Sequence, residues 1–474
     1  MAALIGRRKE RAELDRLTRS PRPEFLAVIG RRRVGKTYLL RGHFANSFCF
    51  ALTGIANGTL ADEIGVFNDA VAEYGGGKRP RVAGWRDAFL VLRQIIEDDP
   101  RPGKKVVLLD ELPWLATRRS GFLEALGHFW NSWAMMRDDL LLIVCGSATS
   151  WMSDKIINNK GGLHNRVTGS LHIKPFSLGE CEHFLTANGV VMTRHQIVEA
   201  YMIFGGIPYY LGLLKPYLSL AQCVDELCFA EAAPLRDEFH NLYASLFPHA
   251  EPHIAVATAL SHRTRGLTRA DIIAETKLTN GGGLTQTLRD LTRSGFIRRY
   301  AAFGKEERDA LFQLADFFSL FALRFRVGQK EHDARFWSNY APTPAHAAWS
   351  GYAFEQVALS HIEQIRRALG ITGTLLSYAS WIGSLDGERA QIDLVIDRHD
   401  QVINLCEMKY SIDPLIVDAA LERAIRRQRA VFASTTKTRK ALHSTLVTTF
   451  PIEPTPHASV FQSVITLDDL FEPA

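Results

Sequence analysis

The stretch FLAVIGRRRVGKTYLLRGHF, residues 25–44, decides the fold of the N-terminal region. It opens with five apolar residues, a run typical of a strand that is buried on both faces of a parallel sheet. Residues 30–37 then match the pattern G-x-x-x-x-G-K-[ST], and a helix-like run follows Thr37. A strand, a glycine loop and a helix in this order predict a phosphate-binding loop in an α/β domain.

Each part of this loop has a chemical reason. Glycines let backbone N–H groups turn inward toward phosphate oxygens, and the start of the next helix adds a positive dipole. Lys36 can reach the β- and γ-phosphates, and the Thr37 hydroxyl can ligate Mg²⁺. We therefore expect ATP and Mg²⁺ as cofactors. The loop residues expected at the nucleotide are Gly30, Arg33, Val34, Gly35, Lys36, Thr37 and Tyr38.

Four further apolar runs continue the pattern of a parallel sheet: SFCFALTG, VVLLDEL, LLLIVCGS and SLHIKPF. VVLLDEL ends in Asp110 and Glu111, at the carboxyl end of a strand, where parallel sheets bind their ligands. Asp110 is the expected Mg²⁺ ligand, and Glu111 is the residue expected to polarise the attacking water. LLLIVCGS leads into Ser147, which either touches the γ-phosphate or the water, or caps the next helix.

The rest of the chain divides by changes in its pattern. Residues 252–326 contain three short amphipathic helices and then two strand-like runs separated by the turn-prone GKEE, which is the composition of a winged helix. The following segment is rich in Pro, Ala and aromatic residues and has the composition of a linker. The expected parts are a sheet core over 1–176, a helical region over 177–236, a winged helix over 237–330, a linker over 331–350 and a second α/β domain over 351–474.

Residues 1–330 resemble the AAA+ superfamily, specifically archaeal-type ATPases related to origin-recognition and signalling NTPases. LIGRRKERAEL is similar to that family's N-terminal box, which implies that Ile5, Gly6 and Arg7 lie near the adenine. GGIPYYL, residues 205–211, is similar to the lid motif, which implies a helical lid over 177–236 with Pro208 against the base. The sequence departs from the pattern in one respect, because it has no clear lid arginine that would sense the γ-phosphate.

Arg166 is a further candidate. It follows a helical stretch and precedes the strand SLHIKPF. In a homo-oligomer an arginine at this position would act in trans on the nucleotide of a neighbouring copy. A surface arginine without such a role fits the sequence equally well.

The C-terminal region carries a second set of chemical groups, in QIDLVID and VINLCEMKY. Side chains alternate between the two faces of a strand, so Glu407 and Lys409 share one face of theirs. If the two runs form a hairpin across RHDQ, Asp393 converges with them. Two carboxylates suit a hard divalent cation, and a lysine beside them can orient water or stabilise a phosphorane-like transition state. Upstream, Glu355 lies among apolar neighbours in a predicted helix, which is unusual for a carboxylate without a partner.

This order of residues resembles the PD-(D/E)xK nuclease superfamily, over about residues 345–474. The resemblance implies that Asp393 and Glu407 hold Mg²⁺ or Mn²⁺, that Lys409 assists the water, and that Glu355 supports the metal shell. The leading proline is absent, since Ile392 precedes Asp393. The alternative is a nuclease-like fold that only binds DNA or only acts as a scaffold.

Basic residues gather in two places that would suit DNA phosphates. The first set is Arg423, Arg426, Arg427, Arg429, Lys437, Arg439 and Lys440, and the second, in the winged-helix segment, is Arg289, Arg293, Arg298 and Arg299. A solvated helix face is the alternative for the first set, and a domain-docking role is the alternative for the second.

Composition bounds these hypotheses. The chain has 474 residues, 46% hydrophobic and 23% charged, with a net charge of +5, which is ordinary for a folded protein and permits a nucleic-acid partner. No apolar run approaches the ~20 residues that span a bilayer, and the charged N-terminus and unpaired cysteine pattern favour a cytoplasmic protein. We expect an ATP-regulated, Mg²⁺-dependent DNA-cleaving enzyme, or alternatively a signalling switch or DNA-binding regulator with an inactive nuclease fold.

Overall fold

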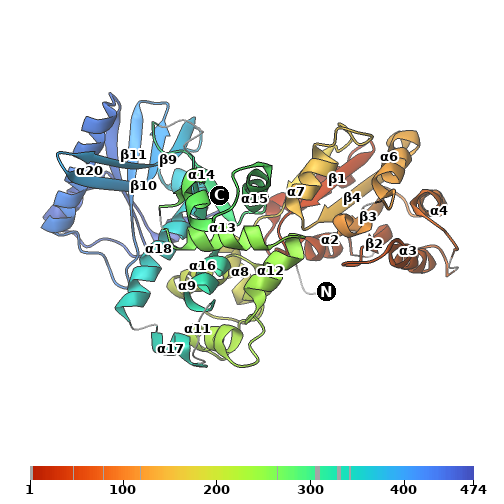
Figure 1. The fold of residues 1–474 in the computed structure, drawn as a ribbon, viewed down its shortest axis with the longest axis horizontal. Helices are drawn as coiled ribbons and strands as arrows, with labels where there is room; N and C mark the ends of the chain where they lie inside the picture. Colours follow the sequence, from red (N-terminus) through yellow and green to blue (C-terminus); the bar gives the residue numbers. More distant parts are fainter. Residues whose placement is uncertain are drawn as a thin grey trace. The chain divides into compact units, whose positions relative to one another are not determined.

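The computed structural model describes residues 4–45, 47–77, 80–117, 119–263, 265–304, 310–327, 333–340 and 343–473 (Figure 1). These residues form two compact units, Met1–Pro175 and Phe176–Ala474. The turn expected within GKEE falls mostly on residues 305–307, outside the described part, as do 331–332 and 341–342 of the expected linker. Among the described helices, none is both long enough and apolar enough to cross a membrane.

A five-stranded parallel sheet forms the centre of the first unit, as the sequence predicts, in the order β2-β3-β4-β1-β5. Its strands are β1 (Glu24–Ile29), β2 (Phe48–Thr53), β3 (Lys105–Asp110), β4 (Leu140–Gly146) and β5 (Gly169–His172). Every residue of β1, β3 and β4 is buried, which explains why their central residues are continuously apolar, with charged residues only at the strand ends, Glu24, Lys105 and Asp110.

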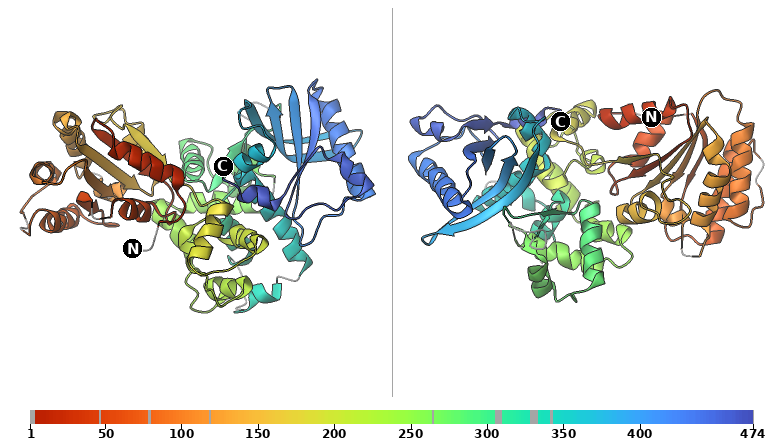
Figure 2. Two further views of the ribbon diagram at one scale, coloured as in Figure 1. Left: turned by 180° about the vertical axis from the view of Figure 1, so that it is seen from behind. Right: turned by 90° about the horizontal axis from the view of Figure 1, so that it is seen from above.

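Helices cover this sheet and connect its strands (Figure 2). They are α1 (Arg8–Thr18), α2 (Lys36–Phe44), α3 (Leu60–Tyr74), α4 (Trp85–Asp98), α5 (Leu112–Leu115), α6 (Phe122–Ser132) and α7 (Thr149–Met152), with short irregular turns η1 (Ala134–Met136) and η2 (Ser153–Ile157). The core between α3, α4, α6 and the sheet is aromatic: the ring of Trp85 lies edge-on to Phe122 at 4.7 Å, and Phe50 packs on Phe67 at 5.5 Å.

The second unit begins with a helical region. It contains α8 (Leu178–Ala187), α9 (Arg194–Phe204), α10 (Pro208–Leu211), α11 (Leu220–Val224), η3 (Asp225–Phe229) and α12 (Glu238–Leu246). Ser177 caps α8 and Glu180 bonds back to the amide of Ser177 at 3.0 Å, so the predicted capping box is present.

Three helices and a small antiparallel sheet follow. The elements are α13 (Glu251–Ser261), β6 (Leu267–Thr268), α14 (Arg269–Thr276), α15 (Gly282–Arg293), β7 (Ile297–Tyr300) and β8 (Leu311–Leu314), with strand order β6-β8-β7. The next helix, α16 (Phe317–Phe325), is buried along most of its length.

The segment expected to be a linker is partly helical. It contains α17 (Phe336–Tyr340) and the start of α18 (Pro344–Ser360), so the helix that carries Glu355 begins before the expected domain start at 351. The reason is tertiary packing: the rings of Trp337 and Trp349 contact Phe325 at 5.2 and 5.3 Å. The buried carboxylate of Asp225 also accepts the amide of Trp337 at 2.7 Å, at the start of α17.

The chain ends in a second five-stranded sheet, in the order β13-β12-β11-β10-β9. Its elements are α19 (Ile362–Ala368), β9 (Leu376–Leu385), β10 (Glu388–Arg398), β11 (Val402–Lys409), α20 (Ala419–Thr436), β12 (Ala441–Thr448), η5 (Pro456–Val460), β13 (Ser463–Ile465) and α21 (Leu467–Phe471). β9, β10 and β11 are antiparallel, and β11, β12 and β13 are parallel. Helix α20 lies against β9 and β10 (Figure 1).

Candidate functional site

The loop after β1 is shaped by left-handed backbone conformations. Gly30, Arg33 and Gly35 have φ values of 155°, 71° and 88°. A side chain at position 30 would lie 2.4 Å from the carbonyl oxygen of Ile173, so only glycine fits there. Gly35 is also the residue before α2, so the loop leads directly into the N-terminus of a helix. This arrangement can cradle an anion with backbone N–H groups.

Lys36 folds back over the loop. Its Nζ donates to the carbonyl oxygens of Gly30 at 2.8 Å and Arg31 at 3.0 Å, and to the hydroxyl of Ser147 at 2.9 Å. Only 5% of Lys36 is exposed. A buried ammonium held by neutral acceptors has its charge uncompensated, and a phosphate group would supply the missing negative charge.

The ends of β3 and β4 bring polar residues to the same edge of the sheet. The Thr37 hydroxyl donates to the buried carboxylate of Asp110 at 2.7 Å. Ser147 donates its hydroxyl to Glu111 at 2.7 Å and its amide to the same carboxylate at 3.2 Å. Ser147 does not cap the next helix, because Ala148 is the residue before α7. The helix-cap alternative for Ser147 is therefore wrong, and the Ser147 hydroxyl links Lys36 to Glu111 through two hydrogen bonds.

The N-terminal segment is attached to this loop. The guanidinium of Arg7 donates to the carbonyl oxygen of Val34 at 2.9 Å and is almost fully buried. Gly6 and Arg7 have φ values of 68° and 57°, so the chain turns sharply just before α1. Ile5 is half-buried in this segment, and Tyr38 on α2 is 46% exposed. Arg7 thus contacts the loop directly, and the place of Ile5, Gly6 and Arg7 near the adenine stays a prediction.

Two further predicted site residues, Arg166 and Pro208, come later in the sequence than the residues of this network. Arg166 is half-buried in the turn before β5, where its amide donates to Leu163 at 3.2 Å. Pro208 belongs to the second unit and is the first residue of α10. Before it, a side chain at Gly206 would lie 1.9 Å from the carbonyl oxygen of Phe176, so glycine is required in this motif.

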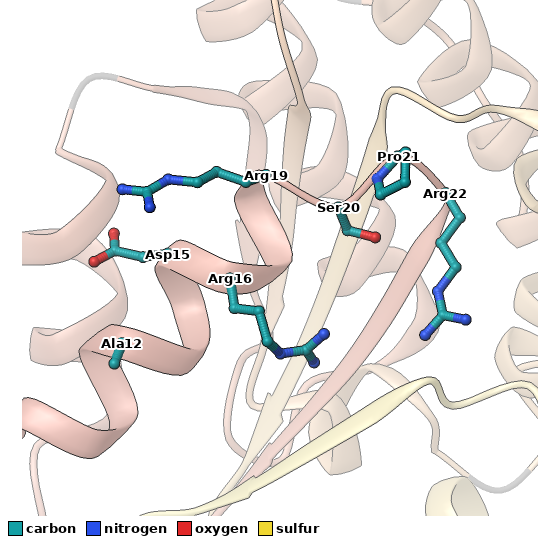
Figure 3. A pocket seen from close by; sticks show the side chains of 7 residues that line it. All are labelled: Ala12, Asp15, Arg16, Arg19, Ser20, Pro21 and Arg22. Carbon is teal, nitrogen blue, oxygen red and sulfur yellow. The ribbon is translucent and has the colours of Figure 1, made fainter.

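A pocket on the first unit lies elsewhere (Figure 3). Its lining residues are Ala12, Asp15, Arg16, Arg19, Ser20, Pro21 and Arg22. They belong to α1 and to the turn that precedes β1, whereas the glycine loop follows β1. The pocket therefore lies at the opposite end of that strand from the loop.

The C-terminal sheet brings Asp393 and Glu407 close together. Strands β10 and β11 pair from Leu394 opposite Cys406 onward, and Asp393 and Glu407 are the next residue on each strand. The charge of Glu407 contributes to the raised pKa of Asp393, as expected of neighbouring carboxylates. The Lys409 Nζ lies 2.7 Å from Glu407 Oε1, on the same strand face. The hairpin is as the sequence predicts, but the regular alternation is wrong for β10, because a bulge between Ile392 and Val395 takes Asp393 out of the period-two pattern.

Glu355 on α18 interacts with the same groups. Burial raises the pKa of Glu355 to about 8, and the charges of Asp393 and Glu407 add to this rise, while Lys409 opposes it. Burial also raises the pKa of Asp393, against the hydrogen bond from Gln391. Within the described residues, no three His, Cys, Asp or Glu side chains are grouped closely enough to hold a metal ion. The arrangement offers a neighbouring pair of carboxylates with a third one nearby.

Sequence reasoning missed two glutamines at this acidic site. Gln391 donates to Asp393 at 2.6 Å, and Gln428 of α20 donates to Glu407 at 3.2 Å and to the carbonyl oxygen of Gln391 at 3.1 Å. Gln391 could have been found, since it shares the face of Asp393 in the alternation. Gln428 gives no signal in the sequence, because it lies in a different element among basic residues.

The basic residues are only partly available to a nucleic acid. Arg298 is turned inward and donates to Gln356 on α18 at 3.2 Å, which is a contact between parts of the second unit. Arg426 pairs with Glu422, Arg427 with Glu388 and Lys440 with Asp397. Other members of the two predicted sets that lie exposed on the surface are Arg289, Arg423, Arg429, Lys437 and Arg439.

Comparison with known proteins bears on the N-terminal region. Residues 4–214 match the family described as an ATPase domain predominantly from Archaea. Residues 4–214 therefore form an archaeal-type ATPase domain. This matched region includes the glycine loop, Asp110, Glu111, Ser147 and the motif around Pro208.

Individual relatives of the ATPase domain are distant. An uncharacterised protein of Methanocaldococcus jannaschii is 26% identical over 214 residues, and the match spans 44% of this chain and 44% of that relative. A Walker-type ATPase of Pyrococcus abyssi is 18% identical with a TM-score of 0.49, over 68% of this chain and 96% of its own. The ORC2 protein of Aeropyrum pernix, solved in ADPNP and ADP complexes, is 15% identical with a TM-score of 0.43, over 68% and 93%. The family assignment rests on the sequence match alone.

Proposed function

We propose that the protein is an ATP-hydrolysing AAA+ enzyme whose C-terminal domain cleaves DNA with Mg²⁺ under the control of nucleotide. In this proposal residues 177–236 are the lid, α13 to α15 with their small sheet are a winged helix, and residues from α18 onward are a PD-(D/E)xK nuclease domain. The partners are DNA and, through Arg166, a second copy of the chain. All six cysteines are free and buried, which is consistent with a reducing cytoplasm.

The loop residues fit a nucleotide with Mg²⁺. Thr37 and Asp110 lie 2.7 Å apart as an oxygen pair of the kind that magnesium takes, and Lys36 is buried beside the cradle. When bound, the ion neutralises charge on the phosphates. Lys36 leaves its carbonyl acceptors to bind the phosphates. Glu111 orients the attacking water, and Ser147 holds the Glu111 carboxylate in place until substrate arrives.

The acidic site fits a divalent cation through the neighbouring carboxylates of Asp393 and Glu407. A bound Mg²⁺ or Mn²⁺ would supply charge for a scissile phosphate. Lys409 then positions or deprotonates the water, and Gln428 fixes the Glu407 carboxylate. Glu355 would support the metal shell, because burial and the charges of Asp393 and Glu407 raise its pKa and a bound cation would favour its charged form.

One observation supports the nuclease part of the proposal: Asp393 and Glu407 flank the paired stretch of one hairpin and interact electrostatically, and Lys409 contacts Glu407 at 2.7 Å. The test is incubation of a supercoiled plasmid with Mg²⁺ or Mn²⁺, with and without ATP. We expect nicking by wild type and loss of nicking in Lys409→Ala. Lys160→Ala is the control, since it removes an exposed lysine that belongs to neither basic set. Equal nicking by wild type and Lys409→Ala would refute the assignment.

A second candidate is a nucleotide-dependent switch or DNA-binding regulator with an inactive nuclease fold. It is favoured by the lack of a three-ligand acidic group among the described residues. A footprint on a defined DNA site, together with an intact plasmid at all metal concentrations, would support this candidate over the nuclease.

A further inference from the structure

The acidic site is not built by the C-terminal sheet alone. The chain that leaves β7 continues along β9, where Ala302 bridges to Ser380 and the amide of Phe303 donates to the carbonyl oxygen of Ser380 at 2.8 Å. The Phe303 ring then packs on Phe432 of α20 at 5.1 Å. The end of β7 is therefore held in the core of the C-terminal domain.

Ser380 stands next to Asp393. Strands β9 and β10 pair with Ala379 opposite Val395 and Trp381 opposite Ile392, so the bulge residues Asp393 and Leu394 together face Ser380. A bulge turns a side chain out of the regular alternation, and bulges are frequent at active sites. The segment that follows β7 thus joins the sheet at the position of the Asp393 carboxylate.

The end of β7 also fixes the backbone at Arg265. The Tyr300 hydroxyl, at the end of β7, donates to the carbonyl oxygen of Arg265 at 2.6 Å. The next residue, Gly266, has a φ of 77°, and a side chain there would lie 2.5 Å from the carbonyl oxygen of Phe312. The backbone at Arg265 is therefore fixed by β7 and β8, while its side chain is exposed.

Electrostatics agree with this placement. Burial raises the pKa of Asp393, and the charges of Lys409 and Arg265 are among those that oppose the rise. Burial likewise raises the pKa of Tyr300 to about 12, with a contribution from the charge of Asp393. Arg265 and Tyr300 therefore both interact electrostatically with Asp393, and both precede the C-terminal sheet in the chain.

We propose that Arg265 is the phosphate-binding cation of the acidic site, and that Tyr300 is the residue that positions it. The inference rests on the proposed function, and the ligand is a phosphodiester group of DNA. A guanidinium can bind two phosphate oxygens with parallel hydrogen bonds, which a lysine cannot do. None of Asp393, Glu407 and Lys409 carries a guanidinium.

The test compares Arg265→Ala with Arg289→Ala, which removes an exposed arginine of α15. Two affinities are measured on the full chain, that of a short DNA duplex in Ca²⁺ and that of Mn²⁺ without DNA. For Arg265→Ala we expect duplex binding about tenfold weaker, the loss of one charge-assisted hydrogen-bonding group. We also expect Mn²⁺ binding to be severalfold tighter, because a positive charge beside the carboxylates has been removed. Arg289→Ala should leave the Mn²⁺ affinity unchanged.

The opposite signs separate this role from a structural one, since damage to the fold would weaken both ligands. Tyr300→Phe should weaken duplex binding less than Arg265→Ala does, and Arg265→Lys should restore the Mn²⁺ affinity of wild type but only part of the duplex affinity. Wild-type Mn²⁺ affinity in Arg265→Ala would overturn the inference. If wild type nicks no plasmid while both shifts are present, the nuclease proposal fails and the placement of Arg265 stands. If Arg265→Ala nicks the plasmid at the wild-type rate, the nuclease proposal stands and the role of Arg265 fails.

Discussion

At the scale of single residues, Ser147 connects the two charged groups of the nucleotide site. It accepts from Lys36 at 2.9 Å and donates to Glu111 at 2.7 Å. Both charged side chains are thus already ordered around the loop, and ATP binding needs to displace hydrogen bonds rather than recruit mobile side chains. Such preorganisation lowers the entropy lost on binding.

Lys36→Ala should remove most ATP binding, by at least about tenfold in affinity, because the ammonium is the main cation on the β- and γ-phosphates. Affinity is measured by calorimetry. The control is Arg32→Ala, which removes an exposed basic side chain of the same loop. If Lys36→Ala binds ATP as wild type does, the loop is not the nucleotide site.

Glu111→Gln should keep ATP affinity near wild type and lose turnover. The substitution preserves hydrogen bonding toward Ser147 but removes the charge that activates water, and removal of a general base typically costs about 10²–10⁴ in rate. Phosphate release at saturating ATP checks this. An unchanged rate would show that another group activates the water.

At the scale of elements, His361 joins the lid region to the C-terminal domain. The amide of Leu178, the first residue of α8, donates to His361 Nε2 at 3.1 Å. The ring must therefore carry its proton on Nδ1, which lies 2.8 Å from the carbonyl oxygen of Val357. Burial lowers the pKa of His361 to about 4, so the ring is neutral wherever this contact is intact.

The stability of the protein should fall as the pH falls from 6.5 toward 4. In this window the unfolded chain binds a proton at His361 and the folded chain does not, so the free energy of unfolding decreases, by about 1.4 kcal/mol for each pKa unit. Urea unfolding of wild type and His361→Gln between pH 4 and pH 7 measures this. The variant should show a flatter profile, and the exposed His262→Gln should follow wild type. Identical profiles for wild type and His361→Gln would contradict the assignment.

A second contact between elements reaches the acidic site directly. The Tyr410 hydroxyl donates to Glu199 of α9 at 3.2 Å, and Tyr410 follows Lys409 in the chain. His195 of α9 lies 3.2 Å from the carbonyl oxygen of Ser411 and packs on the Tyr410 ring at 5.1 Å. The proposed lid therefore holds the end of β11, the strand that carries Glu407 and Lys409.

At the scale of the whole molecule, contacts within the second unit link its first helices to the end of β11. Helix α9 contacts α18 as well as Tyr410 and Ser411. If residues 177–236 act as the proposed lid, their movement would reach Lys409 through Tyr410.

We expect Lys36→Ala to change metal-dependent DNA cleavage, and Tyr410→Phe to reduce the effect of ATP on cleavage while leaving ATP affinity unchanged. ATP shifts an equilibrium only by its different affinity for two states, and a hundredfold difference corresponds to about 2.7 kcal/mol. Cleavage rates at saturating Mg²⁺, with and without ATP, test both variants. If all three proteins cut at one rate in every condition, the domains act independently.

Much of the fold and of the candidate sites of this protein can be predicted from short stretches of its sequence. The loop 30–37 and the apolar strands are predictable because strand, loop and helix are contiguous and each is specified by local backbone needs. The hairpin that brings Asp393 near Glu407 and Lys409 is also predictable, because its two strands are adjacent in the chain, whereas the bulge at Asp393 gives no signal in the alternation.

The tertiary structure alone decided the rest. Trp337 and Trp349 make helices of a segment with the composition of a linker, because Phe321 and Phe325 provide an apolar surface for them. Gln428 and Arg265 reach the acidic site from elements that are distant along the chain, and Arg298 turns inward to Gln356. A sequence pattern reports which face a residue occupies within its own element. What that face meets depends on long-range packing, for which a single sequence contains no local signal.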